Sequence, residues 1–163
     1  MTENEILKEL HFKFGDLILN NSFPKPYCKN LDTVKAILLG CDPTNKFSAN
    51  LPYVFALESG LPIFNSFIAH WERSLNEIGL SLNNVYIQNL CKNYFVTETS
   101  CNRKWDKVAR FWIPYLKEEL CMFPKNIPVL LSSERLYKVL LNDDVGANKA
   151  IEIYQGKSFN SNN

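Results

Sequence analysis

The residue best placed to do chemistry in this chain is Asp42, which follows a short apolar run and a glycine and precedes a proline. An apolar run of this length, here residues 34–39, is typical of a buried strand, and the glycine and proline end it abruptly. In open α/β sheets ligands bind at the carboxyl ends of the strands, so Asp42 is a candidate catalytic carboxylate. The alternative is structural, because Asp-Pro is also an ordinary turn dipeptide.

Two further stretches of the sequence accompany this strand. A second apolar run, residues 85–90, predicts another strand, and near its end stands Asn89, whose amide offers both a donor and an acceptor. Phe55 lies in the turn-rich stretch 43–62, and a loop of this length in a compact domain is usually functional or disordered. The structural alternatives are a core ring for Phe55 and a turn cap for Asn89.

The elements that must position these side chains follow from hydrophobic spacing. Apolar residues at helical spacing predict helices over about 3–19, 64–78, 103–120 and 136–141. Short apolar runs predict strands at 34–39, 85–90, 128–131 and 150–154. Because strands alternate with helices, the expected fold class is α/β, a three-layer α/β/α arrangement around a mostly parallel four-stranded sheet. The apolar stripe of the helix over 64–78, stopped by Gly79, is expected to be core.

Composition limits the size and the charge of the molecule. The chain has 163 residues, 46% of them hydrophobic, which fits a single domain over 1–163 with an ample core. Its formal net charge of +1 gives no global field that attracts nucleic acid. A basic groove would have to be local, and the candidate DNA contacts are Lys92, Arg103 and Lys104.

The five cysteines are widely spaced and contain no Cys-x-x-Cys pair of the kind that zinc and iron–sulfur sites use. We therefore expect reduced thiols, with no metal and no cofactor. The sequence shows no apolar leader and no run near the ~20 residues of a membrane span. These features predict a cytoplasmic monomer with no membrane partner.

Three separated segments line up at one edge of the predicted sheet: residues 40–43, 52–56 and 86–89. In this order and spacing they resemble the uracil-DNA glycosylase superfamily. Its first motif places Asp-Pro after a glycine at a strand end, its next loop carries a Phe, and its second functional strand ends in Asn. The Asn102-Arg103 turn followed by a long helix is similar as well. The resemblance covers roughly residues 30–140.

This resemblance implies a DNA glycosylase of base-excision repair, a hydrolase acting on uracil or a related damaged base in single- or double-stranded DNA without a cofactor. Such an enzyme takes the base out of the stack. By similarity, Asp42 would orient the attacking water at C1′ and stabilise the cationic sugar. Phe55 would stack on the base, and Asn89 would bind its polar edge. Cys41 and Thr44, on either side of Asp-Pro, complete the implied substrate-binding set.

Several positions depart from the superfamily's pattern. The best-known branch has tyrosine where this chain has Thr44 and glutamine where it has Cys41, so selectivity for uracil over thymine is left open. The late motif presents a histidine after the last strand, and residues 155–163 contain none. His11 and His70 fall in predicted helices and cannot fill that role; both are expected to be surface or hydrogen-bonded residues.

The missing histidine has two explanations: truncation at the carboxyl end, or divergence with loss of part of the chemistry. Either predicts weak activity, since one oxyanion donor is worth about a hundredfold to a thousandfold in rate. A catalytically impaired nucleic-acid-binding module of the same fold is the alternative function. A small-molecule enzyme on a Rossmann-like sheet is disfavoured, because the sequence has no Gly-x-Gly-x-x-Gly loop and no P-loop.

Overall fold

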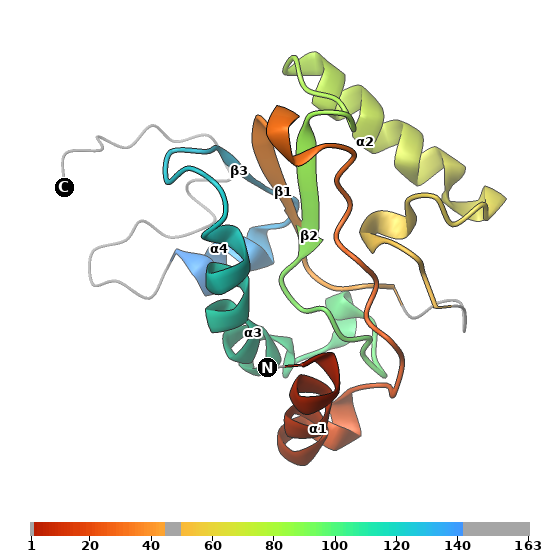
Figure 1. The fold of residues 1–163 in the computed structure, drawn as a ribbon. Coiled ribbons are helices and arrows are strands. Elements are labelled where there is room, and N and C mark those ends of the chain that lie inside the picture. The colour runs from red at the N-terminus through yellow and green to blue at the C-terminus, as the bar shows by residue number, and fades with distance from the viewer. Residues whose placement is uncertain (1, 45–49, 142–163) are drawn as a thin grey trace.

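A three-stranded parallel sheet forms the centre of the computed structural model, which describes residues 2–44 and 50–141 (Figure 1). Its strands are β1 (Ala36–Gly40), β2 (Val85–Asn89) and β3 (Val129–Leu131), in the order β2-β1-β3. β1 is therefore central. Three of the predicted strands are confirmed, and the fourth, predicted at 150–154, lies outside the described residues.

Four α-helices accompany the sheet within the described ranges. They are α1 (Glu3–Phe14), α2 (Asn65–Glu77), α3 (Trp105–Leu120) and α4 (Glu134–Leu140). Short 3-10 turns lie at Gly15–Leu17, Leu31–Thr33, Val54–Ala56, Pro62–Phe64 and Thr99–Cys101. The predicted mixed α/β class is thus confirmed.

Helices pack on both faces of the sheet. On one face Ile37 and Leu39 of β1 belong to the core cluster that includes residues of α3 and α4. On the other face Leu38 belongs to a second cluster with Leu75 of α2. All five residues of β1 are buried, which explains why this strand has a continuous apolar run in the sequence.

The helix ends follow local sequence rules. α1 begins at a capping box in which Thr2 and Glu5 exchange hydrogen bonds. It ends at Phe14 and not at the predicted residue 19, because Gly15, a poor helix former, follows and the chain continues as a 3-10 turn. α2 ends before Gly79 as predicted, and that glycine has a φ of +74°, in the left-handed region.

The apolar stripe of α2 is only partly core, which corrects the prediction. Leu75 is buried, but Phe67 is 43% exposed and Ile78 is 58% exposed. The 13 residues of α2 span about 20 Å, whereas the five residues of β1 span about 17 Å. Part of the stripe therefore extends beyond the sheet, and Phe67 is available to the site described below.

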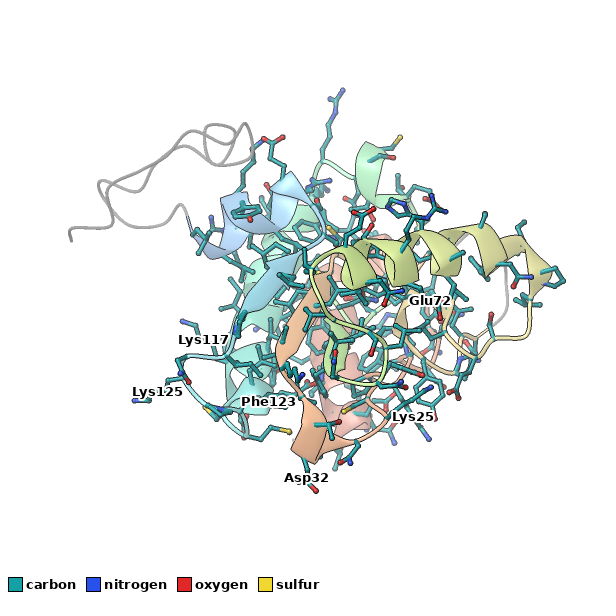
Figure 2. The ribbon with its side chains drawn as sticks, turned by 90° about the horizontal axis from the view of Figure 1, so that it is seen from above. Lys25, Asp32, Glu72, Lys117, Phe123 and Lys125 are labelled. Carbon is teal, nitrogen blue, oxygen red and sulfur yellow. The ribbon has the colours of Figure 1, made fainter. Side chains whose placement is uncertain are left out.

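Charged side chains lie around the outside of the molecule, as Lys25, Asp32 and Glu72 illustrate (Figure 2). Both signs occur there, in keeping with the net charge of +1. None of the helices in the described part of the chain is long and apolar enough to cross a membrane.

Candidate active site

Asp42 lies two residues beyond the end of β1 and is held by the 3-10 turn at Thr99–Cys101 and by the first residue of α3. Its Oδ1 accepts hydrogen bonds from the Thr99 hydroxyl at 2.6 Å and from the Trp105 indole N–H at 2.7 Å. Trp105 is fully buried and is the first residue of α3, so this helix sets the position of the carboxylate. Both hydrogen bonds go to Oδ1, and neither uses Oδ2.

Arg135 of α4 stabilises the segment that holds Asp42. Arg135 donates hydrogen bonds to the backbone carbonyls of Thr99 and, at 2.6 Å, of Asn102. Its guanidinium also lies over the Trp105 ring, 5.0 Å from the centroid. Arg135 thus supports both donors of Asp42. Sequence reasoning missed it, because no spacing along the chain connects Arg135 with residues 99–105.

Burial raises the pKa of the Asp42 carboxyl to about 6. The hydrogen bonds from Thr99 and Trp105 act in the opposite direction, since they favour the charged form. The negative charge of Glu98 adds to the increase, and the positive charge of Arg135 opposes it. The carboxyl therefore titrates close to neutral pH, which suits a group that positions water or transfers a proton.

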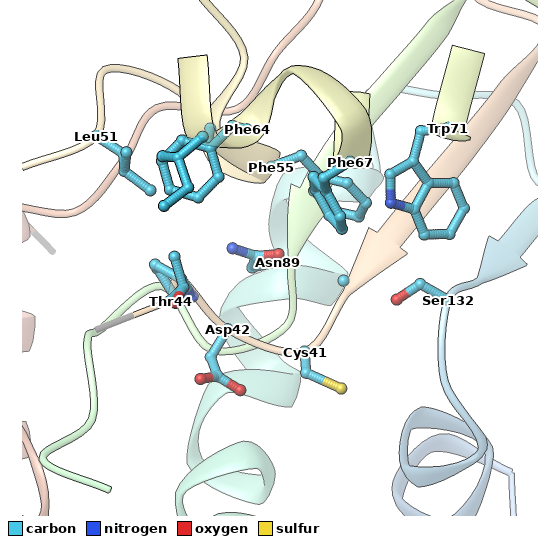
Figure 3. A pocket seen from close by; sticks show the side chains of 14 residues that line it. Cys41, Asp42, Thr44, Leu51, Phe55, Phe64, Phe67, Trp71, Asn89 and Ser132 are labelled. Atoms are coloured by element: carbon cyan, nitrogen blue, oxygen red, sulfur yellow. The ribbon is translucent and has the colours of Figure 1, made fainter. Parts of the chain in front are cut away.

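Asn89 ends β2 and is the register partner of Gly40 at the end of β1. A Cβ atom at Gly40 would lie only 2.2 Å from Asn89 Oδ1, so only glycine leaves room for the amide at this edge. The Asn89 side chain is 2% exposed and lies between the walls of the cavity (Figure 3). An amide in that place can donate one hydrogen bond to a ligand and accept another.

Phe55 is held by a chain of backbone pairings that begins at β2. Tyr27 forms an antiparallel bridge with Ile87, and Lys25, two residues earlier, accepts a hydrogen bond from the Val54 N–H at 2.9 Å. The next residue, Phe55, has a φ of +58° and a ψ of 19°, a left-handed conformation that costs roughly 1–2 kcal/mol for a residue with a Cβ. Such strain persists where the surroundings hold it, often at functional sites.

A cavity of about 540 Å³ lies at the carboxyl edge of the sheet (Figure 3). It brings together the five residues predicted for catalysis and substrate binding: Cys41, Asp42, Thr44, Phe55 and Asn89. The remaining lining residues discussed here, which sequence reasoning missed, come from the loop after residue 50, from the start and body of α2 and from the turn after β3: Leu51, Phe64, Phe67, Trp71 and Ser132. Ser132 lies on the side of Cys41, and the other four form a wall with Phe55 (Figure 3). Part of that wall is the apolar stripe of α2, so the apolar spacing that predicts this helix could also have indicated these lining residues. The volume is typical of a small-molecule site.

Cys41 and Thr44 line the cavity on the same segment as the carboxylate. Burial raises the pKa of the Cys41 thiol to about 11. This thiol is therefore neutral near pH 7, and it lacks the thiolate that nucleophilic catalysis requires.

The three candidate DNA contacts have different surroundings. Lys92 forms an ion pair with Glu119, and its ammonium lies 5.9 Å from the centroid of the Trp112 ring. Only 23% of the Lys92 side chain is exposed, and its charge is paired with that of Glu119. Arg103 and Lys104 are exposed in the turn that leads into α3, next to the segment that holds the carboxylate.

Neither histidine lines the cavity. His70 is exposed on α2, and its ring centroid lies 5.8 Å from that of Trp71. His11 in α1 is half-buried, and its Nε2 has no hydrogen-bond partner among the described residues. The expectation of a surface or hydrogen-bonded histidine is therefore confirmed for His70 and wrong for His11. Residues 155–163, where the late motif would fall, lie outside the described ranges.

In residues 2–44 and 50–141, no group of three or more histidine, cysteine, aspartate or glutamate side chains is arranged to hold a metal ion. Comparison of the chain with protein-family models, with curated proteins and with solved structures gives no match.

Proposed function

We propose that this protein is a DNA glycosylase that hydrolyses the N-glycosidic bond of uracil, or of a related damaged base, in base-excision repair. One observation carries the proposal: a half-buried carboxylate, an aromatic ring and an amide meet in one cavity at the carboxyl edge of a parallel sheet. They are Asp42, Phe55 and Asn89, the residues that the resemblance to the uracil-DNA glycosylase superfamily singles out.

In this proposal the target base leaves the DNA stack and enters the cavity. The Phe55 ring stacks on the base, and the Asn89 amide hydrogen-bonds to its polar edge. As the glycosidic bond breaks, the sugar gains positive charge, and the ionised Asp42 stabilises it while orienting water toward C1′. Because Thr99 and Trp105 occupy Oδ1, Oδ2 is the oxygen assigned to the water.

The departing base carries negative charge, which the superfamily neutralises with a late histidine. This sequence has no histidine after His70. A reaction without such a donor is expected to be about a hundredfold to a thousandfold slower than one that has it.

The finer architecture belongs to the same proposal. For the whole chain we propose a mostly parallel sheet of four strands. The support is that β3 has β1 as its one partner among the described strands, and that Val129 is 44% exposed beside an apolar groove. We also propose that the protein is a cytoplasmic monomer, in keeping with five thiols that form no disulfide.

The test is release of uracil from a single-stranded oligonucleotide by the full chain. Release is expected, and Asp42→Asn and Asn89→Ala are each expected to abolish it. Asp32→Asn, which changes an exposed aspartate, serves as the matched control and should leave the rate unchanged. Equal release by Asp42→Asn, Asn89→Ala and the unaltered chain would disprove the assigned roles.

Arg103 and Lys104, exposed beside the segment that holds the carboxylate, favour one second candidate, a nucleic-acid-binding module that keeps the cavity without the chemistry. This module would bind single-stranded DNA with an affinity that falls as salt rises, since phosphate contacts release counterions. No base would be released. Absence of DNA binding at low salt would remove this candidate.

A further inference from the structure

Two aromatic side chains of α2 line the cavity without having a part in the roles proposed for Asp42, Phe55 and Asn89. Phe67 and Trp71 stand one helical turn apart on this helix. Phe67 is 43% exposed although it lines the cavity, so this wall continues to the surface. An exposed ring at the rim of a cavity is not accounted for by packing of the core.

The rings of the cavity wall form a continuous aromatic surface. The Phe55 centroid lies 5.3 Å from that of Trp71 and 6.0 Å from that of Phe67, and the planes of the two phenylalanines differ by 35°. The Phe67 and Trp71 centroids are 6.3 Å apart. The surface therefore leads from the half-buried Phe55 to the exposed Phe67 (Figure 3).

This surface is larger than one pyrimidine requires. A single flipped base stacks on one ring, and in the proposed function that ring is Phe55. Phe67 lines the cavity and remains 43% exposed. Aromatic rings next to one another bind successive bases of single-stranded nucleic acid, because every base has a flat face to stack.

We propose that Phe67, backed by Trp71, is a stacking site for the nucleotide next to the target base, so that single-stranded DNA is the preferred substrate. This inference rests on the proposed function. In a duplex the neighbouring base is paired and stacked, and bringing it to Phe67 would require a second base to leave the helix. In a single strand no pairing has to be broken.

The experiment uses a single-stranded oligonucleotide with the fluorescent base 2-aminopurine beside the uracil, and the full chain carrying Asp42→Asn to prevent release. Binding is expected to quench the fluorescence. Adding Phe67→Ala should weaken the affinity about five- to a hundredfold and remove the quenching. Phe67→Tyr should keep both, because it keeps the ring, whereas Phe67→Leu should resemble Phe67→Ala.

The matched control is Ile78→Ala, which removes a side chain of similar exposure just after the other end of α2 and should change neither signal. If Phe67→Ala leaves affinity and quenching unchanged while the unaltered chain releases uracil, the stacking site is disproved and the glycosylase proposal stands. If the affinity falls equally for an oligonucleotide whose neighbouring nucleotide is abasic, Phe67 contacts the target base itself, and the inference also fails. If the unaltered chain neither binds DNA nor releases uracil, both proposals fall.

Discussion

At the scale of single residues, the charge of Asp42 controls the proposed reaction. The reaction needs the carboxylate, and burial raises the pKa of Asp42 to about 6. The rate of uracil release should therefore be low at pH 5, increase about tenfold per unit below the pKa, and level off above pH 7. Single-turnover rates measured from pH 4.5 to 8 test this.

The Thr99 hydroxyl affects the pH range over which the rate increases, which is the ascending limb of the pH–rate profile. Thr99→Val deletes a donor to the charged form of Asp42, so the pKa should increase and the limb should move about one to two pH units upward. Thr99→Ser keeps the donor and should leave the limb in place. A limb that does not move in Thr99→Val, or a rate without pH dependence, would contradict the role of the carboxylate.

Gly40 gives a second prediction at this scale. A Cβ atom there would lie 2.2 Å from Asn89 Oδ1 and 2.6 Å from a ring carbon of Phe55. Gly40→Ala must therefore displace two side chains of the cavity, with a loss of about 1–3 kcal/mol in the free energy of unfolding and a large loss of uracil release. Thermal unfolding and release assays on the same protein measure both.

Gly15→Ala is the control for Gly40→Ala. Gly15 has a φ of −50°, and a Cβ atom built there meets nothing within 4 Å. This substitution should be neutral or should stabilise the protein by about 0.4–1 kcal/mol, through the unfolded chain. If the two alanine variants behaved alike, crowding at Gly40 would not be the cause.

At the scale of elements, Glu119 of α3 joins this helix to β2 and the segment after it. Its carboxylate accepts hydrogen bonds from Tyr86, Gln88 and Lys92. Burial acts to raise the pKa of Glu119, but these three donors outweigh it, and the pKa lies below its ordinary value. The folded state therefore favours the ionised form, so this stability is present at neutral pH and is lost as the pH falls through the lowered pKa.

Glu119→Ala is expected to lower the free energy of unfolding by about 3 kcal/mol at pH 7, since Lys92 and two polar groups lose their partner. Urea denaturation measures the change. Glu118→Ala alters the exposed neighbour and should stay within about 0.5 kcal/mol of the unaltered protein. If Glu119→Ala changed the free energy of unfolding by the same small amount at pH 4 and at pH 7, the stabilising role of the Glu119 carboxylate would be contradicted.

Elements were predictable where hydrophobic spacing is decisive. β1, α3 and the end of α2 at Gly79 all follow from local pattern. The end of α1 at Phe14 and the exposure of Phe67 do not, because the apolar spacing of α1 continues past its last helical residue and the stripe of α2 is longer than the sheet it covers.

The residues of the candidate site also fall into two groups, those that the sequence could predict and those that it could not. Asp42 and Asn89 could be predicted, because each stands at the end of a predicted strand, whereas Phe55 was predicted through the family resemblance. Thr99 and Arg135 could not, because their contacts depend on how α3 and α4 dock against the sheet. A sequence pattern contains the spacing within an element but not the distance between two elements.

At the scale of the whole molecule, the cavity depends on both layers of helices. The carboxylate is fixed by α3, the aromatic wall comes partly from α2, and the strand end between them supplies Gly40. Neither layer alone would form the pocket. We expect loss of either layer to abolish ligand binding together with the fold, as one cooperative event.

The central place of β1 also bears on how the chain acquires its fold. β1 is synthesised first of the three strands, yet it pairs on both sides with strands that follow much later. During translation this apolar segment leaves the ribosome well before β3 exists, and each pairing must close a long loop against chain entropy. Folding of this protein is therefore expected to be slow and late, with a period in which an unpaired hydrophobic strand needs shielding from self-association.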